Sequence, residues 1–315
     1  GSSEEKIIDV SSDVAMLQSR KVLLKDRVIE NTIEKSHRLI GSSDGWVLSS
    51  NINGQLTIDF MDDKSMKKSF NLKKTIAGAS IKDDILAVLF ADNEMALYSI
   101  SKESLLVKVQ GSAPVVVDSR IVNPYFMNDL VLFLTLDGKI VIVNSKLKKK
   151  LRTTIVSSED NFNNIIYFNV IDSKLIAATG HKILSMAAKE IRVSYEIRNI
   201  AYDNKYIFIT TKQGEVISLT SDLQVNAKVK FPFAHFLGLI IDKDKIYVLE
   251  KEGYIIEISK DLLTYDVYEV DIKDGYIFAA DKMFYIDDKY ISVEQKDEYK
   301  FIADEMLYED DEFEQ

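Results

Sequence analysis

Residues 245–260 read Lys-Ile-Tyr-Val-Leu-Glu-Lys-Glu-Gly-Tyr-Ile-Ile-Glu-Ile-Ser-Lys, and this stretch decides the fold. Two short runs rich in β-branched and aromatic residues flank Glu252-Gly253. Such runs on either side of a two-residue turn with Gly predict a β-hairpin. The same unit recurs along the whole chain, so its recurrence predicts the fold better than any single residue.

The hairpin turns recur at a mean spacing of 39 residues. They lie at Asn53-Gly54, Asp92-Asn93, Asp137-Gly138, Gly180-His181, Gln213-Gly214, Glu252-Gly253 and Asp287-Asp288. A period of about 40 residues made of short strands is typical of propeller blades. A second turn signal, rich in Asp and Asn, precedes each hairpin, at Asp44, 83–84, 128–129, 172–173, 203–204, 242–244 and Asp281. Asp and Asn tolerate left-handed backbone conformation, so this signal predicts the turn from the innermost strand to the second.

Several strands, such as 85–90 and 130–134, are apolar along their whole length. A strand that is apolar on both faces must be covered on both faces, as in a stack of sheets. We therefore predict an all-β fold, a seven-bladed β-propeller of four-stranded antiparallel blades. A strand near Lys21–Leu24 is expected to complete the last blade and close the circle. The predicted blades are Ile33–Leu72, Thr75–Gln110, Pro124–Val156, Ile165–Glu196, Ile197–Phe231, His235–Val270 and a seventh that begins near Asp274.

The predicted organisation is a flexible leader over 1–19, a single propeller over 20–296 and an acidic C-terminal tail over 297–315. This tail holds nine acidic side chains and one Lys, and so carries −8 of the net charge of −10. Acidic and basic residues are nearly balanced in the rest of the chain, so the composition does not indicate the basic surface typical of nucleic-acid-binding proteins. No apolar run reaches about 18 residues, so no membrane span is predicted.

Cysteine is absent from the chain, which excludes disulfides, thiolate metal sites and cysteine nucleophiles. Gly1-Ser2-Ser3 resembles an expression scar, and no initiator Met precedes Glu4. We therefore expect that a leader was removed, either a secretory or lipoprotein signal or simply residues outside an expression boundary.

The sequence shows no pattern typical of catalysis or metal binding. His37, His181 and His235 lack metal-ligand spacing, and Asp242-Lys-Asp244 lacks the later ligands of a calcium loop. Gly-x-Gly-x-x-Gly is absent, and a Ser-His-Asp arrangement stays open because its members can be distant in sequence. The recurring acidic residues occupy turn positions, which explains them without a pair of catalytic carboxylates. We predict no catalytic residue, no metal site and no cofactor.

Aromatic residues at connections between blades are the candidates for a partner-binding surface. Three Phe and one His fall within six residues at Phe231, Phe233, His235 and Phe236. Tyr125, Phe126 and Phe162 are expected to add to the same face. Exposed aromatic residues would form an adhesive patch, and the alternative is that they pack between neighbouring blades.

Residues 133–143 (Phe-Leu-Thr-Leu-Asp-Gly-Lys-Ile-Val-Ile-Val) and 209–219 (Ile-Thr-Thr-Lys-Gln-Gly-Glu-Val-Ile-Ser-Leu) resemble the repeat of the quinoprotein-type (PQQ-like) propellers. The enzymes of that family carry regularly placed Trp residues, whereas this chain has only Trp46. The resemblance therefore implies the non-catalytic branch, which includes BamB-like propeller lipoproteins of the outer-membrane β-barrel assembly machinery. It implies a periplasmic scaffold that a lipid anchors to the outer membrane.

We predict a non-catalytic protein–protein interaction scaffold, a periplasmic lipoprotein of the outer-membrane assembly type. Other proteins are its expected partners, with no nucleic acid and with membrane contact only through a lipid anchor. The alternatives are a propeller enzyme, either a quinoprotein dehydrogenase or a glycosidase, and a cytosolic scaffold.

Overall fold

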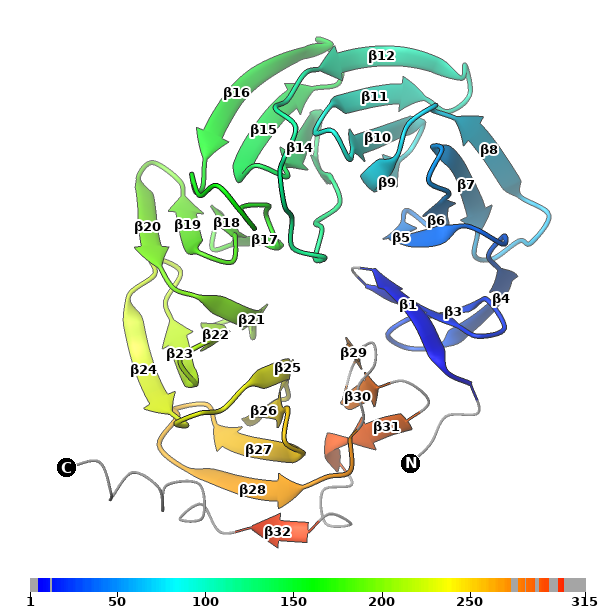
Figure 1. Cartoon of the computed structure of the whole chain (residues 1–315). Helices are drawn as coiled ribbons and strands as arrows, with labels where there is room; N and C mark the ends of the chain where they lie inside the picture. Colours follow the sequence, from blue (N-terminus) through cyan, green and yellow to red (C-terminus); the bar gives the residue numbers. More distant parts are fainter. Residues whose placement is uncertain are drawn as a thin grey trace. The chain divides into compact units, whose positions relative to one another are not determined.

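The computed structural model describes residues 5–11, 13–272, 277–280, 282–286, 289–294 and 300–302. The described strands form eight small sheets (Figure 1), and each is built from consecutive strands of the chain except that β32 joins the sheet of β25–β28. The described part of the chain holds no helix that is long and apolar enough to cross a membrane. The chain divides into two compact units, one of residues 9–169 and 177–181 and the other of residues 1–8, 170–176 and 182–315.

The first four sheets lie in the unit of residues 9–169, apart from the first two residues of β1. The first sheet is β1 (Ile7–Ser11), β2 (Val14–Leu17), β3 (Lys21–Leu23) and β4 (Val28–Thr32). The second is β5 (Arg38–Ser43), β6 (Trp46–Ser50), β7 (Gln55–Phe60) and β8 (Lys67–Asn71). The third is β9 (Ile76–Lys82), β10 (Ile85–Phe90), β11 (Met95–Ser99) and β12 (Ser104–Val109). The fourth is β13 (Tyr125–Met127), β14 (Leu130–Leu134), β15 (Lys139–Asn144) and β16 (Lys149–Ile155).

The fifth sheet has strands in both units, and the last three lie in the other unit. The fifth is β17 (Tyr167–Ile171), β18 (Lys174–Ala178), β19 (Lys182–Met186) and β20 (Glu190–Ser194). The sixth is β21 (Ile197–Tyr202), β22 (Ile207–Thr211), β23 (Glu215–Leu219) and β24 (Val225–Lys230). The seventh is β25 (Phe236–Ile241), β26 (Lys245–Glu250), β27 (Tyr254–Ser259) and β28 (Tyr265–Glu269), with β32 (Lys300–Ile302) beside β28. The eighth is β29 (Ile277–Ala280), β30 (Met283–Ile286) and β31 (Lys289–Ser292).

The stretch over 245–260 forms the hairpin of β26 and β27, with Lys245 opposite Ser259 and Glu250 opposite Tyr254. Both kinds of turn signal take the backbone conformation that their residues favour. Gly54, Gly138, Gly214 and Gly253 have positive φ in hairpin turns, and Asp44, Asp83 and Asn128 have positive φ between first and second strands. Asp281 and Asp287-Asp288 lie outside the described residues.

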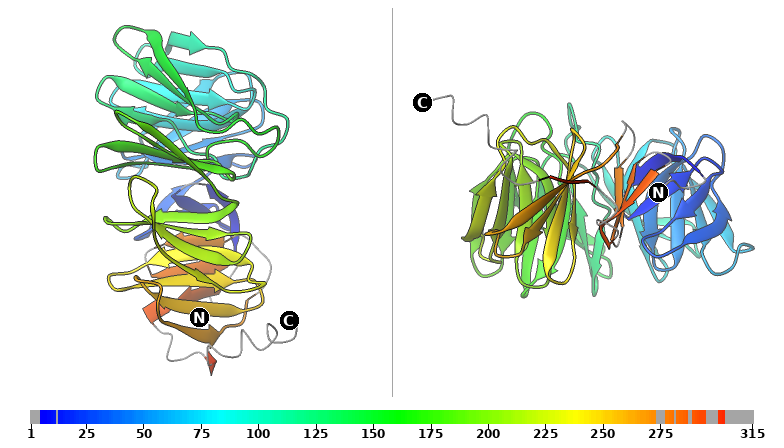
Figure 2. Two further views of the ribbon diagram at one scale, coloured as in Figure 1. Left: turned by 90° about the vertical axis from the view of Figure 1, so that its left-hand side faces the viewer. Right: turned by 90° about the horizontal axis from the view of Figure 1, so that it is seen from below.

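Neighbouring sheets within each unit pack face to face, and Figure 2 shows them from the side. Their middle strands supply most of the core, and β10 and β22 are buried over nearly their whole length. One core cluster joins the second and third sheets through Leu48, Ile58 and Val88. Another joins the sixth and seventh sheets through Phe208, Val248 and Ile256. The expectation that apolar strands are covered on both faces is therefore confirmed.

The predicted number of seven blades is wrong, because the propeller has eight blades, of which the last has three strands. Lys21–Leu23 does not complete the last blade but forms β3 of a separate first blade. Residues 7–11 and 14–17, assigned above to a flexible leader, form β1 and β2 of that blade. Of the predicted acidic tail over 297–315, only β32 lies among the described residues, and Gly1–Glu4 also lie outside them.

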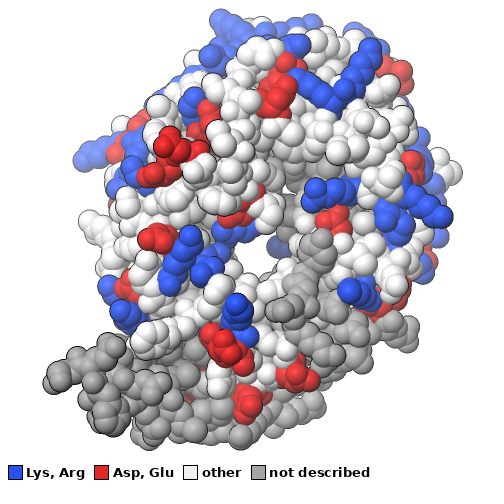
Figure 3. Space-filling model, in the orientation of Figure 1, with Lys and Arg blue, Asp and Glu red and all other residues white. Residues whose placement is uncertain are grey.

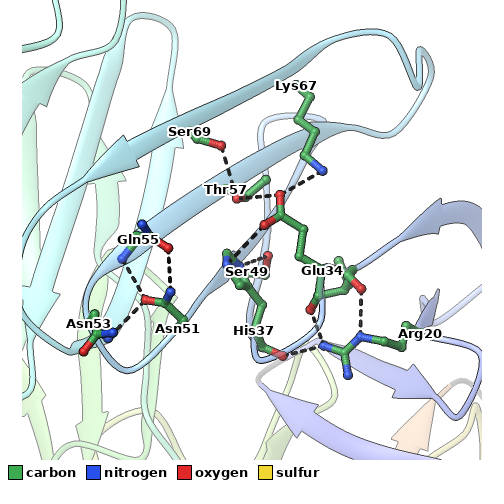
Figure 4. A network of polar contacts seen from close by, with 11 residues as sticks. Arg20, Glu34, His37, Ser49, Asn51, Asn53, Gln55, Thr57, Lys67 and Ser69 are labelled. Atoms are coloured by element: carbon green, nitrogen blue, oxygen red, sulfur yellow. Dashed lines mark hydrogen bonds and ion pairs between the residues drawn. The ribbon is translucent and has the colours of Figure 1, made fainter.

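The first blade escaped the sequence pattern because its hairpin turn lacks Gly and Asn. Arg20 takes the left-handed position there, with φ of 69°. Its guanidinium donates hydrogen bonds to the carbonyl oxygens of Ile33 (2.7 Å), Glu34 (2.5 Å) and His37 (2.7 Å) (Figure 4). These bonds hold the turn against the segment that leads to the second blade, which compensates for the strain of a non-Gly residue at positive φ.

Candidate protein-binding surfaces

The aromatic segment between β24 and β25 is only partly exposed. Phe231 and Phe236 are 1% and 2% exposed, and both belong to the core of the sixth and seventh blades. The Phe231 ring meets Phe236 and Tyr265 edge to face, with centroids 6.3 Å and 4.8 Å away. These two Phe side chains therefore stabilise the packing between blades, as the alternative interpretation of the sequence held.

Phe233 is the exposed member of this segment, at 84% of its surface. It has φ of 63° in a turn that the Ala234 N–H closes by donating to the Phe231 carbonyl oxygen (3.1 Å). His235 donates its backbone N–H to Glu250 Oε1 (3.1 Å), and its side chain is half-buried. Burial holds the pKa of His235 below its ordinary value, and the positive charges of Arg198 and Lys251 lower it further. Phe233 is the member of this segment that offers most of its side chain to a partner.

The other three candidates lie in the unit of residues 9–169. Tyr125 begins β13, is partly exposed, and packs against Phe168 with ring centroids 5.0 Å apart. Phe126 is half-buried against the core of the third and fourth blades. Phe162 is half-exposed and has φ of 53° in the loop that follows β16.

The structure adds three residues that the sequence reasoning missed. Val115, Val116 and Val117 are exposed in the connection between β12 and β13, and Val115 is exposed over 84% of its surface. The Phe162 N–H donates to the Val116 carbonyl oxygen (2.9 Å), so the two loops meet at this point. We call Val115, Val116, Val117 and Phe162 the apolar loop surface. The run of three β-branched residues just after Pro114 is the signal that could have revealed it.

Buried asparagines anchor both ends of this connection. Asn164 is fully buried, and its Oδ1 accepts the Asp118 N–H (2.7 Å). Its Nδ2 donates to the carbonyl oxygens of Asp118 (3.2 Å) and Arg120 (2.8 Å). At the other end, Asn93 Nδ2 donates to the Ser112 carbonyl oxygen (3.1 Å). A loop fixed in this way presents its apolar side chains at a smaller entropic cost on binding.

A third asparagine fixes the end of the connection to the innermost strands. Asn123 Nδ2 donates to the Ile40 carbonyl oxygen (3.1 Å), and its Oδ1 accepts the Ala79 N–H (3.2 Å). A Cβ atom on Gly41 or Gly78 would lie 2.6 Å or 2.9 Å from the Asn123 amide, so both neighbours are glycines. The anchors thus lie on both sides of the segment that carries the three valines.

A cavity of about 370 Å³ lies beside the start of this connection, between the third and fourth blades. Asp137 is its acidic residue, with Lys139 and Lys150 also in the lining. Burial alone would raise the pKa of Asp137, but hydrogen bonds from Thr135, Lys139 and Asn93 hold it below its ordinary value. Asp137 Oδ1 accepts from Thr135 (2.6 Å) and Asn93 (2.8 Å), and Oδ2 pairs with Lys139 (2.9 Å). Asp137 is therefore an ionised structural carboxylate, ill suited to act as a general acid or base.

The structure does bring a Ser, a His and an acidic residue together in the second blade (Figure 4). His37 Nδ1 lies 3.2 Å from Ser49 Oγ, and His37 Nε2 lies 3.4 Å from Glu34 Oε2. Ser49 is only 1% exposed, so a substrate cannot reach its hydroxyl. Glu34 also pairs with Lys67 (2.9 Å), which lowers the pKa of its carboxyl. This row of contacts ties the 33–37 segment to β6 and β8 and lacks an accessible nucleophile.

The remaining histidine, His181, contacts the Asn161 carbonyl oxygen through Nε2 (3.1 Å). Among the residues that the structure describes, no group of three or more His, Asp or Glu side chains could hold a metal ion.

Comparison with known proteins identifies the architecture. The chain is similar to the crystal structure of BamB from Moraxella catarrhalis, with a TM-score of 0.67 and 12% identity over 89% of this chain and 92% of that one. The fold is a BamB-like β-propeller. It is also similar to the C-terminal WD40 domain of Sif2, with a TM-score of 0.65 and 10% identity over 92% of this chain and 96% of that one. The propeller fold that the resemblance to quinoprotein-type propellers implies is thus confirmed.

In sequence, the propeller is similar to the plasminogen-binding protein PgbB of two Helicobacter pylori strains. The identity is 35% for strain J99 and 34% for strain 26695, each over 204 residues that make up 64% of this chain. The matched part spans only 38% of the length of either relative. No protein-family model matches the chain.

Proposed function

We propose that this propeller is a non-catalytic protein-binding scaffold whose docking site is the apolar loop surface. The observation that carries the proposal is the combination of exposed Val115 and Phe162 with a fully buried anchor at Asn164. Surface apolar side chains held on a rigid framework favour binding, because little conformational freedom remains to be lost.

Plasminogen is the partner with which we propose to test this function. The support is the name of the Helicobacter pylori relatives, which match most of this chain. Because this chain spans 38% of those relatives, plasminogen binding by the propeller itself is part of the proposal.

The test is the affinity of the purified chain for immobilised plasminogen, measured by surface plasmon resonance. Val115→Asp is expected to weaken binding at least tenfold, about 1.4 kcal/mol, because a charge would be buried at the contact. Leu263→Asp is the matched control, since Leu263 is 79% exposed, lies outside the apolar loop surface, and should bind as the parent does. An equal loss of plasminogen affinity in both variants, or no loss of affinity in Val115→Asp, would contradict the proposed site.

Phe233, His235, Tyr125 and Phe126 are not members of the apolar loop surface and are proposed as partner contacts of lower priority. Phe233→Ala tests whether the turn between β24 and β25 contributes to the same partner. Phe231 and Phe236 are unsuitable for such a test, because changing either would disturb the core.

We further propose that the scaffold works in the cell envelope, as a periplasmic lipoprotein anchored to the outer membrane and related in role to BamB. The fold shared with BamB supports this proposal, as do relatives whose name describes binding to plasminogen. The test is fractionation of cells that express the native gene, with mass spectrometry of the N-terminal peptide. A lipid-modified peptide in the outer-membrane fraction is expected, and an unmodified cytosolic protein would contradict the compartment. Co-purification with outer-membrane assembly proteins but not plasminogen would favour the BamB-like role.

The rival enzyme function finds little support in the geometry. Ser49 is inaccessible and the oxygens of Asp137 are already engaged, so neither side chain is available for hydrolysis of a substrate. A rise in melting temperature on addition of pyrroloquinoline quinone and calcium would nevertheless favour the quinoprotein alternative, because a bound ligand stabilises the folded state.

A further inference from the structure

The cavity between the third and fourth blades has the size and the opening of a ligand site. Its volume of about 370 Å³ falls at the small end of the range of about 300–1,000 Å³ that is typical of small-molecule sites. Asn93, Met95 and Thr135 line it and are only 1%, 2% and 1% exposed. Its exposed lining residues are Gln110, Gly111, Ser112, Lys150 and Thr153. The cavity thus has a buried floor and a rim that opens to solvent.

A bulge in β16 turns two polar side chains toward this cavity. Thr153 pairs with Val141 and Lys150 pairs with Val143, because the register shifts at Leu151. Paired residues of neighbouring strands lie on the same face of a sheet, and residues two positions apart on one strand do so too. Lys150 and Thr153 therefore share the face that lines the cavity. Without the bulge, Leu151 would stand opposite Val143 in the place of Lys150.

The lining carries one positive charge that the chain does not balance. Asp137 and Lys139 neutralise each other through an ion pair of 2.9 Å. Lys150 forms no ion pair within the part of the chain that the structure describes. In the same part of the chain, the hydroxyl groups of Ser112 and Thr153 have no hydrogen-bond partner. Lys and Arg side chains gather at the top of Figure 3, where Figure 1 draws β16.

Glu94 lies beside the rim, but other residues already neutralise its charge. It accepts a hydrogen bond from Gln110 Nε2 (2.6 Å). Its carboxylate also pairs with Lys74 (3.0 Å) and Lys108 (3.4 Å). The acidic group nearest in sequence to the buried floor therefore does not offset the charge of Lys150.

The remaining wall of the cavity is apolar. Met95 and Val109 are cross-strand partners in the third blade, and Val141 faces them from the fourth blade. All three pack in or against the core that joins these two blades. Water in contact with such a wall is unfavourable, so a hydrocarbon group that displaces this water would add to the affinity of a ligand.

We infer that this cavity binds a small organic anion, a carboxylate that carries a short apolar chain. The carboxylate accepts hydrogen bonds from Lys150 Nζ and from the hydroxyl groups of Ser112 and Thr153. The apolar chain lies against Met95 and Val141. An inorganic anion would cover only the polar part of the lining, and a neutral alcohol would supply no charge opposite Lys150. Plasminogen binding plays no part in this inference, so either proposal can fail without the other.

Hexanoate is the probe for this site, and the methyl group of Met95 is the reporter. The purified chain is labelled with ¹³C in the methyl groups of its eight Met residues, and Met95→Leu assigns the Met95 resonance. Hexanoate should shift this resonance saturably, with a Kd on the order of 1 mM for a ligand of this size. Met186, buried in β19 of the fifth blade, should not respond. Hexan-1-ol and inorganic phosphate should each bind roughly fivefold more weakly or worse.

The protein variants change the lining one feature at a time. Lys150→Gln should weaken hexanoate binding about fivefold, because an exposed charge is lost. Lys149→Gln is the matched control, since Lys149 is the exposed neighbour that does not line the cavity, and it should bind as the parent does. Thr153→Phe should abolish the Met95 shift at an unchanged melting temperature, because the ring fills the cavity from an exposed strand position.

Three results would overturn the inference. The first is the absence of a saturable Met95 shift with hexanoate. The second is an equal Kd for hexanoate and either hexan-1-ol or phosphate, since the cavity would then not recognise a charge together with an apolar chain. The third is an equal Kd for Lys149→Gln and Lys150→Gln, or a Met95 shift that persists in Thr153→Phe, since the ligand would then bind elsewhere.

Discussion

Removing the anchor of the apolar loop surface should loosen the loop without changing any exposed side chain. In Asn164→Ala, the three hydrogen bonds to the backbone of Asp118 and Arg120 are lost. At about 1 kcal/mol for each bond the total is about 3 kcal/mol, which is an upper value because water can reach part of this backbone. We therefore expect a loss of about 1–3 kcal/mol in the free energy of unfolding.

The assay is urea unfolding at equilibrium, combined with amide hydrogen exchange of Asp118. The Asp118 N–H donates to Asn164 Oδ1 in the parent, so its exchange should become much faster in the variant. Asn161→Ala is the matched control, because Asn161 is exposed and lies three positions earlier in the same loop. A loss below about 0.5 kcal/mol with unchanged exchange would refute the view that Asn164 anchors the loop.

Three further comparisons test the fold. Gly214→Ala should lower the free energy of unfolding by roughly 1–3 kcal/mol, because a Cβ atom would lie 2.2 Å from the Phe231 carbonyl oxygen at φ of 81°. Gly180→Ala should change it by less than about 0.5 kcal/mol, because a Cβ atom there would meet only the Phe162 carbonyl oxygen, at an ordinary contact distance of 3.9 Å. Thermal unfolding of the pair measures the difference, and equal costs would contradict it. In urea unfolding, Phe231→Ala should lower the free energy of unfolding by about 3–5 kcal/mol and Phe233→Ala by less than about 0.5 kcal/mol. The reverse order would mean that Phe233, and not Phe231, is the buried ring. Burial raises the pKa of Asp59, against the charge of Lys67, so ionising Asp59 costs stability as pH rises through its folded-state pKa. In urea titrations, Asp59→Asn should therefore have a higher free energy of unfolding than the parent at pH 7 and nearly the same one at about pH 3.5. A difference in this free energy that does not change with pH would contradict the view that ionising Asp59 costs stability.

The middle of the chain was predictable because its turns depend on residue types with a special backbone preference. Gly54 and Gly138 adopt the left-handed conformation that their hairpins require, and Asp44 and Asp83 do so between first and second strands. These requirements are local, so they leave a readable signal at fixed spacing in the sequence. Seven blades were predicted from these signals, one fewer than the eight that the structure has.

The first blade was missed because its hairpin turn depends on contacts that are distant in sequence. Hydrogen bonds to carbonyl groups of residues 33–37 hold Arg20 at positive φ, and no local sequence pattern predicts such hydrogen bonds. One signal was nevertheless present. Asp13 precedes the buried strand Val14–Leu17 just as Asp44 and Asp83 precede later second strands. The Asp13 carboxylate accepts hydrogen bonds from the backbone N–H (3.3 Å) and hydroxyl of Ser42, and so joins the first blade to the second.

The candidate surface was predictable only in part, because composition does not reveal which apolar side chains find a place in the core. Phe231 and Phe233 are two residues apart, yet one is buried and the other is exposed. The difference follows from the turn: the positive φ of Phe233 turns the chain, while the Phe231 N–H remains bonded to the Gly214 carbonyl oxygen (2.8 Å). A connection between blades therefore exposes apolar residues where its backbone is held by polar anchors. By that argument the buried asparagines, more than the aromatic residues, mark the location of the proposed binding surface.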